Sequence, residues 1–306
     1  MIRIVPGYCV LLLTLCLPSA SATDFHVYYL GGQSNMDGYG YVRDLPDQTA
    51  EKLAAVPIFH GNPAADATPV DGKGVWSALQ PGHGAGFSTD GRANQYSDRF
   101  GVELTLARRL MKKFPQRRIA FIKYSRGGTS IEIDAAGPFG CWDPDFTEGA
   151  GAGQSVNQYD HFLATIRNAT QVDDIDGDGQ RDRLIPAGIV WMQGESDAAY
   201  TREIAERYEA NLKRLMDLIR AALRADDLPV VIGRISDSGQ DEKDGRQWDF
   251  GDIVRSAQAS FCQKDESAAL VTSTDEYSYS DPWHYDSAGY IDLGQEFADA
   301  LAALEE

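Results

Sequence analysis

The chain has 306 residues, of which 46 are acidic and 28 are basic, so its formal net charge is −18 at pH 7. An acidic surface repels phosphate groups, which argues against nucleic acid and anionic membranes as partners. With 43% hydrophobic residues, the chain is long and apolar enough to bury the core of one large domain.

The first 22 residues have the composition of a secretory signal peptide. Arg3 supplies the positive start, residues 10–17 supply the apolar core, and Ala20-Ser21-Ala22 forms a small-residue cleavage site. A lipid anchor at Cys16 is less favoured, because the preceding residue is a bulky leucine. We therefore expect a secreted or periplasmic protein whose single domain spans residues 23–306. No later segment approaches the ~18 continuous apolar residues of a membrane span.

Short apolar runs rich in β-branched or aromatic residues predict strands at residues 26–31, 119–124, 187–192, 230–235 and 269–273. Apolar residues that recur every three or four positions predict helices at residues 102–114, 204–223 and 293–304. This alternation predicts an α/β fold, a three-layer α/β/α sandwich around a central, mainly parallel sheet of about five strands.

Two long segments, residues 37–99 and 134–157, interrupt this alternation. Both are rich in glycine and polar residues, and they have few periodic apolar positions. Loops of this length in a compact domain are usually either functional or disordered. Because both segments leave the carboxyl ends of strands, we expect them to wall an active-site cleft.

The first predicted strand ends in Gly32-Gln33-Ser34-Asn35-Met36. Ligands of open α/β sheets bind at the carboxyl ends of the strands, so Ser34 lies at a favourable position. A serine there becomes a nucleophile if a histidine and a carboxylate reach it. The alternative is a serine that only caps a short helix.

The second predicted strand leads into Tyr124-Ser125-Arg126-Gly127-Gly128-Thr129-Ser130. The two glycines let the backbone approach a bound group and expose its amides. Such amides are the donors that stabilise a developing oxyanion. An ordinary strand-to-helix turn is the alternative.

An acidic segment, Asp174-Ile175-Asp176-Gly177-Asp178-Gly179-Gln180-Arg181-Asp182, precedes the third predicted strand. Carboxylates at alternate positions followed by glycine match the first half of a calcium loop. We expect a structural calcium ion held by the side chains of Asp174, Asp176, Asp178 and Asp182 and by the carbonyl group of Gln180. Position 12 of the loop is Ile185 rather than glutamate, which excludes a full EF-hand. The alternative is a solvated acidic loop.

The third predicted strand ends in Trp191-Met192-Gln193-Gly194-Glu195-Ser196-Asp197. The side-chain amide of Gln193 is a candidate oxyanion donor, and Glu195 is a candidate buried anchor for the loops. The alternative is a polar segment that opens a helix, with Asp197 as its cap.

The last motif, Asp281-Pro282-Trp283-His284, supplies a carboxylate and a histidine three residues apart, which face the same way on a turn. The aspartate can accept the Nδ1 proton and leave Nε2 free to take a proton from Ser34. A turn that caps the C-terminal helix is the alternative.

Two further residue types leave alternatives open. Cys141 and Cys262, the cysteines that remain after removal of the signal, form either a disulfide or two buried thiols. The side chains of Trp142, Trp248 and Trp283 either stack on sugar rings or pack in the core.

Taken together, the four motifs resemble the sequence blocks of the SGNH (GDSL-type) hydrolases, and the GQSNM wording resembles their sialate O-acetylesterase-like branch, which is carbohydrate esterase family 6-like. The resemblance covers most of residues 23–306. It implies Ser34 as the nucleophile, His284 as the base and Asp281 as the orienting carboxylate.

The resemblance also implies an oxyanion hole formed by the Ser34 and Gly127 amides and the Gln193 side chain, with Gly128 as the alternative to Gly127. It implies a supporting role for Gln33, Asn35 and Glu195. The bulky Trp283 between the two triad residues and the acidic segment before the third strand depart from the family pattern.

We therefore expect a secreted serine esterase that removes acetyl groups from an oligo- or polysaccharide and needs no cofactor for catalysis. One alternative is a catalytically silent glycan-binding protein on the same fold. The other is an SGNH thioesterase or lipase, which the long polar insertions make less favourable than a carbohydrate esterase.

Overall fold

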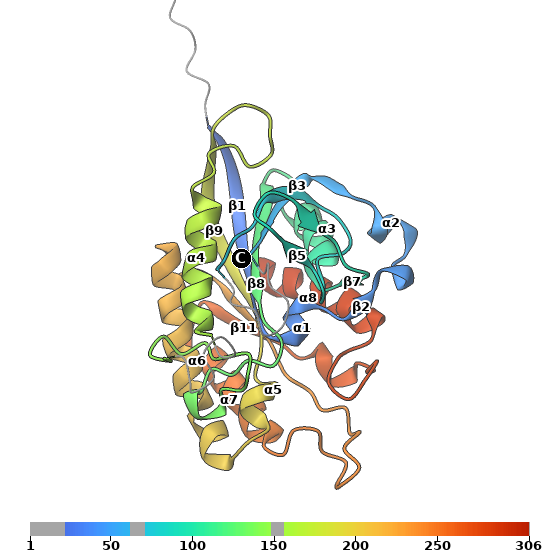
Figure 1. Ribbon diagram of the computed structural model, residues 1–306, viewed down its shortest axis with the longest axis vertical. Coiled ribbons are helices and arrows are strands. Elements are labelled where there is room, and N and C mark those ends of the chain that lie inside the picture. Colours follow the sequence, from blue (N-terminus) through green and yellow to red (C-terminus); the bar gives the residue numbers. More distant parts are fainter. Residues whose placement is uncertain (1–21, 62–70, 148–155, 306) are drawn as a thin grey trace, which may run out of the picture.

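A seven-stranded sheet forms the centre of the protein, in the order β11-β10-β9-β1-β8-β3-β4. All neighbouring strands are parallel except β4, which runs antiparallel to β3 at one edge. The computed structural model describes residues 22–61, 71–147 and 156–305, and Figure 1 shows the sheet with helices on either side. The predicted signal peptide lies outside the described residues, except for Ala22.

The strands of the central sheet are β1 (Thr23–Gly32), β3 (Leu53–His60), β4 (Trp76–Leu79), β8 (Arg118–Ser125), β9 (Asp182–Met192), β10 (Val230–Gly233) and β11 (Ala268–Val271). Two small sheets pair β2 (Gly40–Tyr41) with β7 (Arg99–Phe100) and β5 (Ser88–Thr89) with β6 (Asn94–Gln95). The α-helices are α1 (Ser34–Asp37), α2 (Asp47–Ala50), α3 (Glu103–Lys113), α4 (Gln158–Thr170), α5 (Glu195–Ala198), α6 (Arg202–Leu223), α7 (Gly251–Lys264) and α8 (Ser287–Leu304). Short 3₁₀ turns are η1 (Val42–Asp44), η2 (Ile133–Ala135) and η3 (Ser273–Glu276).

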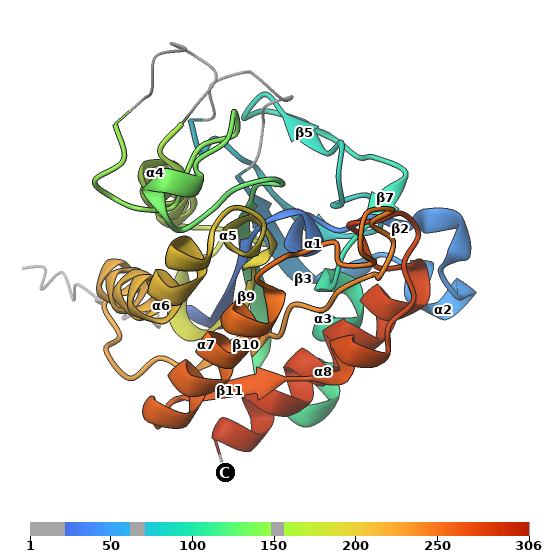
Figure 2. The same cartoon turned by 90° about the horizontal axis from the view of Figure 1, so that it is seen from below.

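The helices cover both faces of the sheet, so the predicted three-layer sandwich is confirmed. Helices α4, α6 and α7 lie on one face and α3 and α8 on the other (Figure 2). In α6 the Thr201 hydroxyl caps the first turn by accepting the backbone N–H of Ile204. The buried stripe of α6 faces the core and consists of Ile204, Tyr208, Leu212, Leu215 and Ile219.

The sheet has two strands more than the five that the sequence predicted. Both extra strands, β3 and β4, lie within residues 37–99, which we expected to be loop. The apolar signal of β3 is short, because Ala54 and Ala55 are exposed and Pro57 is a residue that usually argues against a strand. Strand β4 has four residues at the sheet edge, three of them only partly buried.

Three central strands reach the same level at their carboxyl ends. Gly32 of β1 lies beside Ser125 of β8 on one side and Met192 of β9 on the other. The φ of Gly32 is 142°, and a Cβ atom there would lie 2.0 Å from the Met192 carbonyl oxygen. Only glycine fits this position. The segments that follow these strands therefore begin side by side, and Ser34 belongs to one of them.

A fully buried ion pair lies beneath these segments. The Lys123 ammonium of β8 donates to Glu103 Oε2 of α3 at 3.0 Å, and neither side chain is exposed. It also donates to the carbonyl oxygens of Asp37 and His83 at 2.9 and 2.8 Å. Burial would raise the pKa of Glu103, but the charge of Lys123 together with smaller contributions, among them the Gly101 N–H, outweighs burial, and the net pKa is lowered. One cation thus joins β8, α3, the end of α1 and the loop that contains His83.

Replacing this cation should unfold the protein more readily than replacing a surface lysine. Lys123→Met leaves the buried Glu103 carboxylate and two carbonyl groups without their donor, so we expect a loss of about 3–5 kcal/mol in the free energy of unfolding. The matched control is Lys213→Met, whose exposed partner is Asp217 and for which we expect less than about 1 kcal/mol. Urea titrations measure both, and equal losses would contradict this account of Lys123.

Candidate active site

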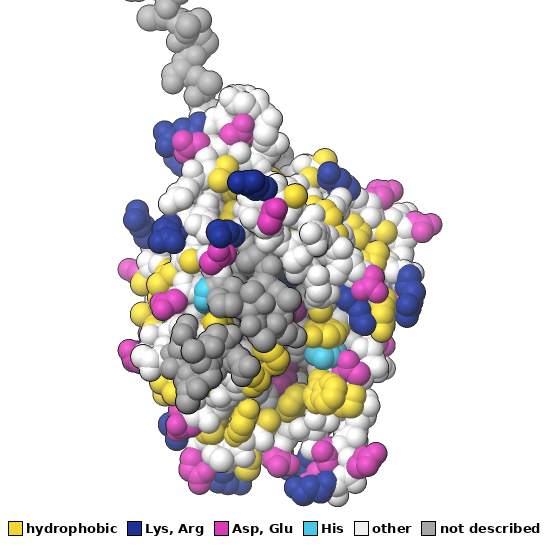
Figure 3. Space-filling view, in the orientation of Figure 1, with side chains coloured by type: hydrophobic (Ala, Val, Ile, Leu, Met, Phe, Trp, Pro, Cys, Tyr) yellow, Lys and Arg dark blue, Asp and Glu magenta, His cyan; other side chains and the backbone are white. Residues whose placement is uncertain are grey.

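A cleft of about 780 Å³ opens at the carboxyl ends of the strands. The segments after β1, β8 and β9 contribute to its wall through Ser34, Gly127 and Ser196, and residues 283–284 contribute Trp283 and His284. In Figure 3, a group of hydrophobic side chains lies below the centre of the view with a histidine at its edge.

The two long insertions also line the cleft, as the sequence predicted. The first contributes residues 84–88 and the second contributes residues 137–139. Part of the second insertion, residues 148–155, lies outside the described residues.

Ser34 is the first residue of α1 and follows β1 after Gln33. It is 8% exposed and lines the cleft, and its hydroxyl group makes no hydrogen bond within the described part of the chain. The Gln33 N–H continues the strand ladder by donating to the Met192 carbonyl at 2.9 Å. The strand ladder therefore holds the serine at the floor of the cleft and leaves its Oγ atom available.

Asp281 holds His284 from two sides. Its Oδ2 lies 2.8 Å from His284 Nδ1, and its Oδ1 accepts the backbone N–H groups of Trp283 and His284, each at 2.8 Å. The Tyr39 ring stacks on the imidazole, with centroids 3.5 Å apart and an interplanar angle of 3°. Because Nδ1 is occupied, Nε2 is the nitrogen available to a group in the cleft.

The electrostatics favour the protonation states that a base and its partner need. Burial lowers the pKa of His284, the Asp281 carboxylate partly offsets this, and the net pKa is below the usual value of 6.5. Burial would raise the pKa of Asp281, but its hydrogen bonds to His284 and to two backbone amides outweigh burial and lower it. At neutral pH the imidazole is therefore neutral and the carboxylate is ionised.

Three polar side chains that the resemblance singled out join the loops beneath the cleft. The Asn35 amide donates to Glu195 Oε1 at 2.7 Å and to the Trp283 carbonyl at 3.2 Å. The Gln33 side-chain oxygen accepts the N–H groups of Gly194 and Ser196 at 3.2 and 3.3 Å. These bonds connect the segments that follow β1 and β9 with the segment that carries His284. Burial raises the pKa of Glu195 to about 7.

The structure contradicts the predicted role of Gln193 as an oxyanion donor. Its side chain is fully buried, and its amide donates to the Thr129 carbonyl at 3.1 Å and to Asp197 Oδ2 at 2.6 Å. Its side-chain oxygen accepts the Tyr208 hydroxyl. The amide is therefore used inside the protein, where it fixes the loop after β9. Sequence spacing could not show which way this side chain turns.

The Gly127 amide is also engaged, which argues against its predicted role. It donates at 2.9 Å to Oδ2 of Asp37, a cleft residue that the sequence analysis did not single out. Asp37 also accepts the Ser125 hydroxyl, and burial raises its pKa despite these bonds. The N–H groups of Ser34 and Gly128 make no hydrogen bond within the described residues, so these two remain candidate oxyanion donors. The sequence signal that could have identified Asp37 as a cleft residue was its position three residues after Ser34.

The three tryptophans divide between core and cleft. Trp142 is fully buried, packs edge-on against Trp191 and donates to the Thr129 hydroxyl, so of its two alternatives it packs in the core and does not contact sugar. Trp248 and Trp283 line the cleft, and Trp283 is 49% exposed. The sequence analysis missed other aromatic residues of the same wall, namely Tyr39, Phe87, Phe139 and Tyr200.

The remaining predicted residues lie away from the cleft. Cys141 and Cys262 are free thiols, and burial raises the pKa of each to about 12. The acidic segment is at the opposite end of β9 from Gln193.

Comparison with protein families decides the relationship. Residues 24–303 match the family described as carbohydrate esterase, sialic acid-specific acetylesterase. The chain belongs to this family. A search of curated protein sequences found no match.

Solved structures share the fold at low sequence identity. A protein from Arabidopsis thaliana is 18% identical with a TM-score of 0.63, and the match covers 92% of this chain and 99% of that one. A carbohydrate acetylesterase from Xanthomonas citri is 17% identical with a TM-score of 0.60, and the match covers 91% of this chain and 56% of that one. NanS is 15% identical with a TM-score of 0.58, and the match covers 93% and 99%.

The pH dependence of ester hydrolysis should reveal how Asp281 and Tyr39 each shift the pKa of His284. We expect kcat/KM to fall as pH drops through the lowered pKa of His284, because the protonated imidazole is no longer a base. Asp281→Asn removes a charge that raises this pKa, so the acid limb should move to lower pH while kcat falls by roughly 10³–10⁴. Tyr39→Ala exposes the imidazole, so its acid limb should move to higher pH.

Asp227→Asn, which changes an exposed residue in the turn between α6 and β10, is the control and should leave the limb in place. Shifts of the same sign in the Asp281 and Tyr39 variants would contradict the electrostatic account.

Proposed function

We propose that the protein is a secreted serine esterase that hydrolyses O-acetyl esters of carbohydrates through Ser34, His284 and Asp281. The observation that carries the proposal is the 2.8 Å contact between Asp281 and His284 in a cleft that Ser34 also lines. The family match supports the reaction class.

The reaction would proceed in two halves. Ser34 Oγ attacks the acetyl carbonyl carbon while His284 Nε2 takes the hydroxyl proton, and the N–H groups of Ser34 and Gly128 face the developing oxyanion. Collapse of the tetrahedral intermediate breaks the bond to the sugar oxygen, which receives the proton from His284. Water, activated by the same imidazole, then hydrolyses the acetyl-enzyme to acetate and regenerates the serine. Each step uses only protein groups and water, so no cofactor is invoked.

An acetylated oligo- or polysaccharide fits this cleft better than a fatty acyl chain. Trp283 and Tyr200 offer partly exposed rings at the rim, 49% and 52% exposed, where a sugar ring can stack. Among the residues that the structure describes, Arg126 is the only lysine or arginine that lines the cleft, and it lies over the Phe139 ring. A thioesterase or lipase would be expected to cover its acyl site with an apolar lid, whereas residues 84–88 of the first insertion are mainly small.

Two further parts of the proposal rest on other observations. Secretion or a periplasmic location rests on the composition of residues 1–22. Within the described residues, no helix is both long and apolar enough to cross a membrane. A silent glycan-binding protein is the competing function, but it would have no need for the Asp281–His284 contact beside Ser34.

Removing the nucleophile should abolish hydrolysis without unfolding the protein. We expect Ser34→Ala to lose at least roughly 10³-fold in kcat on p-nitrophenyl acetate and on acetylated glycans, because the variant lacks the attacking Oγ atom. Circular dichroism checks the fold, and Ser256→Ala on the exposed face of α7 is the control. Wild-type turnover in Ser34→Ala would refute the assignment, and an inert wild type that binds glycans would establish the binding protein.

The rim tryptophan should affect sugar binding rather than chemistry. Trp283→Ala keeps the backbone N–H that Asp281 accepts, so the triad stays in place. We expect the KM for an acetylated oligosaccharide to rise roughly 3- to 10-fold from the lost stacking, with little change for p-nitrophenyl acetate. Leu163→Ala, an exposed apolar residue on α4, is the control. Equal effects on both esters would show that Trp283 acts on the triad instead.

A further inference from the structure

The acidic loop between α4 and β9 is far from the cleft. It leads into the amino-terminal end of β9, whereas the cleft lies at the carboxyl ends of the strands. Figure 1 shows the loop at the opposite end of the sheet from α1 and α5, which both contribute residues to the cleft wall. Ile175 anchors the loop because it is buried in the core at 4% exposure. The Asp182 N–H donates to the Asp173 carbonyl, which closes the loop at its base.

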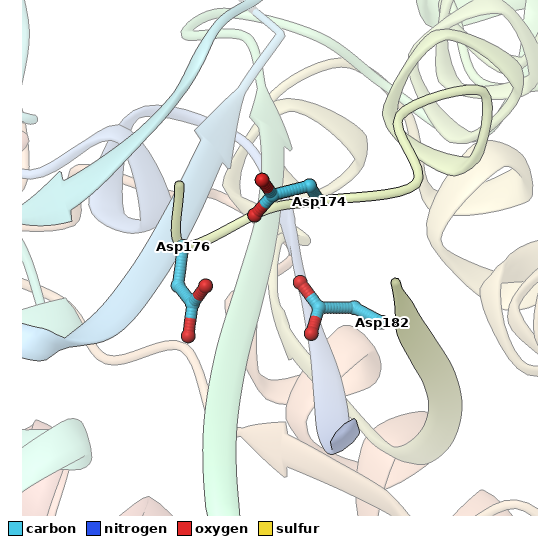
Figure 4. A group of neighbouring side chains, drawn as sticks. All are labelled: Asp174, Asp176 and Asp182. Atoms are coloured by element: carbon cyan, nitrogen blue, oxygen red, sulfur yellow. The ribbon is translucent and has the colours of Figure 1, made fainter. Parts of the chain in front are cut away.

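Three carboxylates of this loop converge. Asp174, Asp176 and Asp182 each offer one oxygen, and these oxygens all lie within 4.8 Å of one another. Figure 4 shows the three carboxylates pointing toward a common centre. Oxygens on opposite sides of one calcium ion are at most about 5 Å apart, since Ca–O distances are about 2.3–2.6 Å. A single ion can therefore contact all three.

One of these oxygens is buried and has no partner. Asp182 is 8% exposed, and its Oδ2 accepts the Ile175 N–H at 2.7 Å. Its Oδ1 is inaccessible to solvent and has no hydrogen-bond partner in the described structure. A carboxylate oxygen that is buried without a donor is costly, and two neighbouring carboxylates make it more so. A cation at the common centre would satisfy it.

The nearby basic side chains do not satisfy the buried Asp182 oxygen. Arg118 reaches Asp176 Oδ2 at 3.3 Å, and Arg181 reaches Asp173 at 3.4 Å, both at exposed positions. Neither guanidinium pairs with Asp182. The Asp174 oxygens accept the N–H groups of Gly177, Asp178 and Gly179, which orient that carboxylate and leave lone pairs for a cation.

We propose that Asp174, Asp176 and Asp182 bind one calcium ion, with backbone carbonyls and water completing its coordination. All three donors are oxygens, which suits calcium and magnesium rather than zinc. Calcium takes several carboxylate ligands in a flexible geometry, whereas magnesium usually keeps several waters and binds one or two carboxylates, so three converging carboxylates favour calcium.

This site is smaller than the set that the sequence predicted. Asp178 does not belong to the converging group, and its carboxylate is turned to Gln180, whose N–H it accepts at 2.8 Å. The ion would hold the loop against the first residue of β9, which pairs with Thr23 of β1. Its role is structural, because the cleft lies at the other end of these strands.

Calcium titration of the full chain tests the proposal. After treatment with EDTA and its removal, we expect calorimetry with calcium chloride to show one site per chain and tighter binding than magnesium chloride. Asp182→Asn and Asp174→Asn should each weaken calcium binding by roughly tenfold or more, since each removes a charged ligand. Asp173→Asn, an exposed neighbour outside the group, is the matched control and should bind as the wild type does.

The melting temperature, measured with and without calcium, provides an independent test. Without calcium, Asp182→Asn should melt no lower than the wild type, because it removes an unpartnered buried charge while keeping an acceptor for the Ile175 N–H. With calcium, the wild type should gain stability and the variant should not, so the order reverses. Absence of calcium binding in the wild type, or wild-type affinity in Asp182→Asn, would overturn the proposal. Esterase activity at low temperature should be unchanged by EDTA, which separates this test from that of the proposed function.

Discussion

The common level at which β1, β8 and β9 end is the constraint on which the cleft depends. It requires β1 to pass Met192 so closely that position 32 accepts no side chain. From there the ladder continues for one more bond on each side, from the Gln33 N–H to Met192 and from the Arg126 N–H to Gly32. Three loops that are more than sixty residues apart in sequence thereby leave the sheet together, and the serine has no freedom to move away from them.

Buried polar side chains then hold these loops, and most of them do not face the cleft. Asp197 accepts the N–H groups of Ile131 and Glu132 and the Gln193 amide, so it joins the loop after β8 to the loop after β9. Burial raises its pKa to about 6. The Asn35 amide likewise joins the loop after β9 to the segment that carries His284, because it donates to Glu195 and to the Trp283 carbonyl. Several polar residues of the family's sequence blocks therefore position the site, whereas Ser34, Asp281 and His284 have groups that the chemistry can use.

The sequence predicted the layers and the central strands well because their apolar runs are continuous and, in β1, β8, β9 and β10, largely buried. It missed β3 and β4, where Pro57 and short, half-exposed segments hide the strand pattern. Motif order brought Ser34 and the Asp281–His284 pair to one cleft. It could not show that Gln193 turns inward, that Gly127 donates to Asp37, or that Trp142 packs in the core. Those outcomes depend on contacts between loops, which no local pattern encodes.

Covalent labelling of the serine tests the central claim most directly. A fluorophosphonate, which forms a stable bond with an activated serine, should be added to the wild type and to His284→Ala, and the labelled peptide identified by mass spectrometry. The account predicts that the label is found on Ser34 in the wild type and is lost in the histidine variant. Label on another residue, or equal labelling of Ser34 in both proteins, would contradict a serine activated by His284.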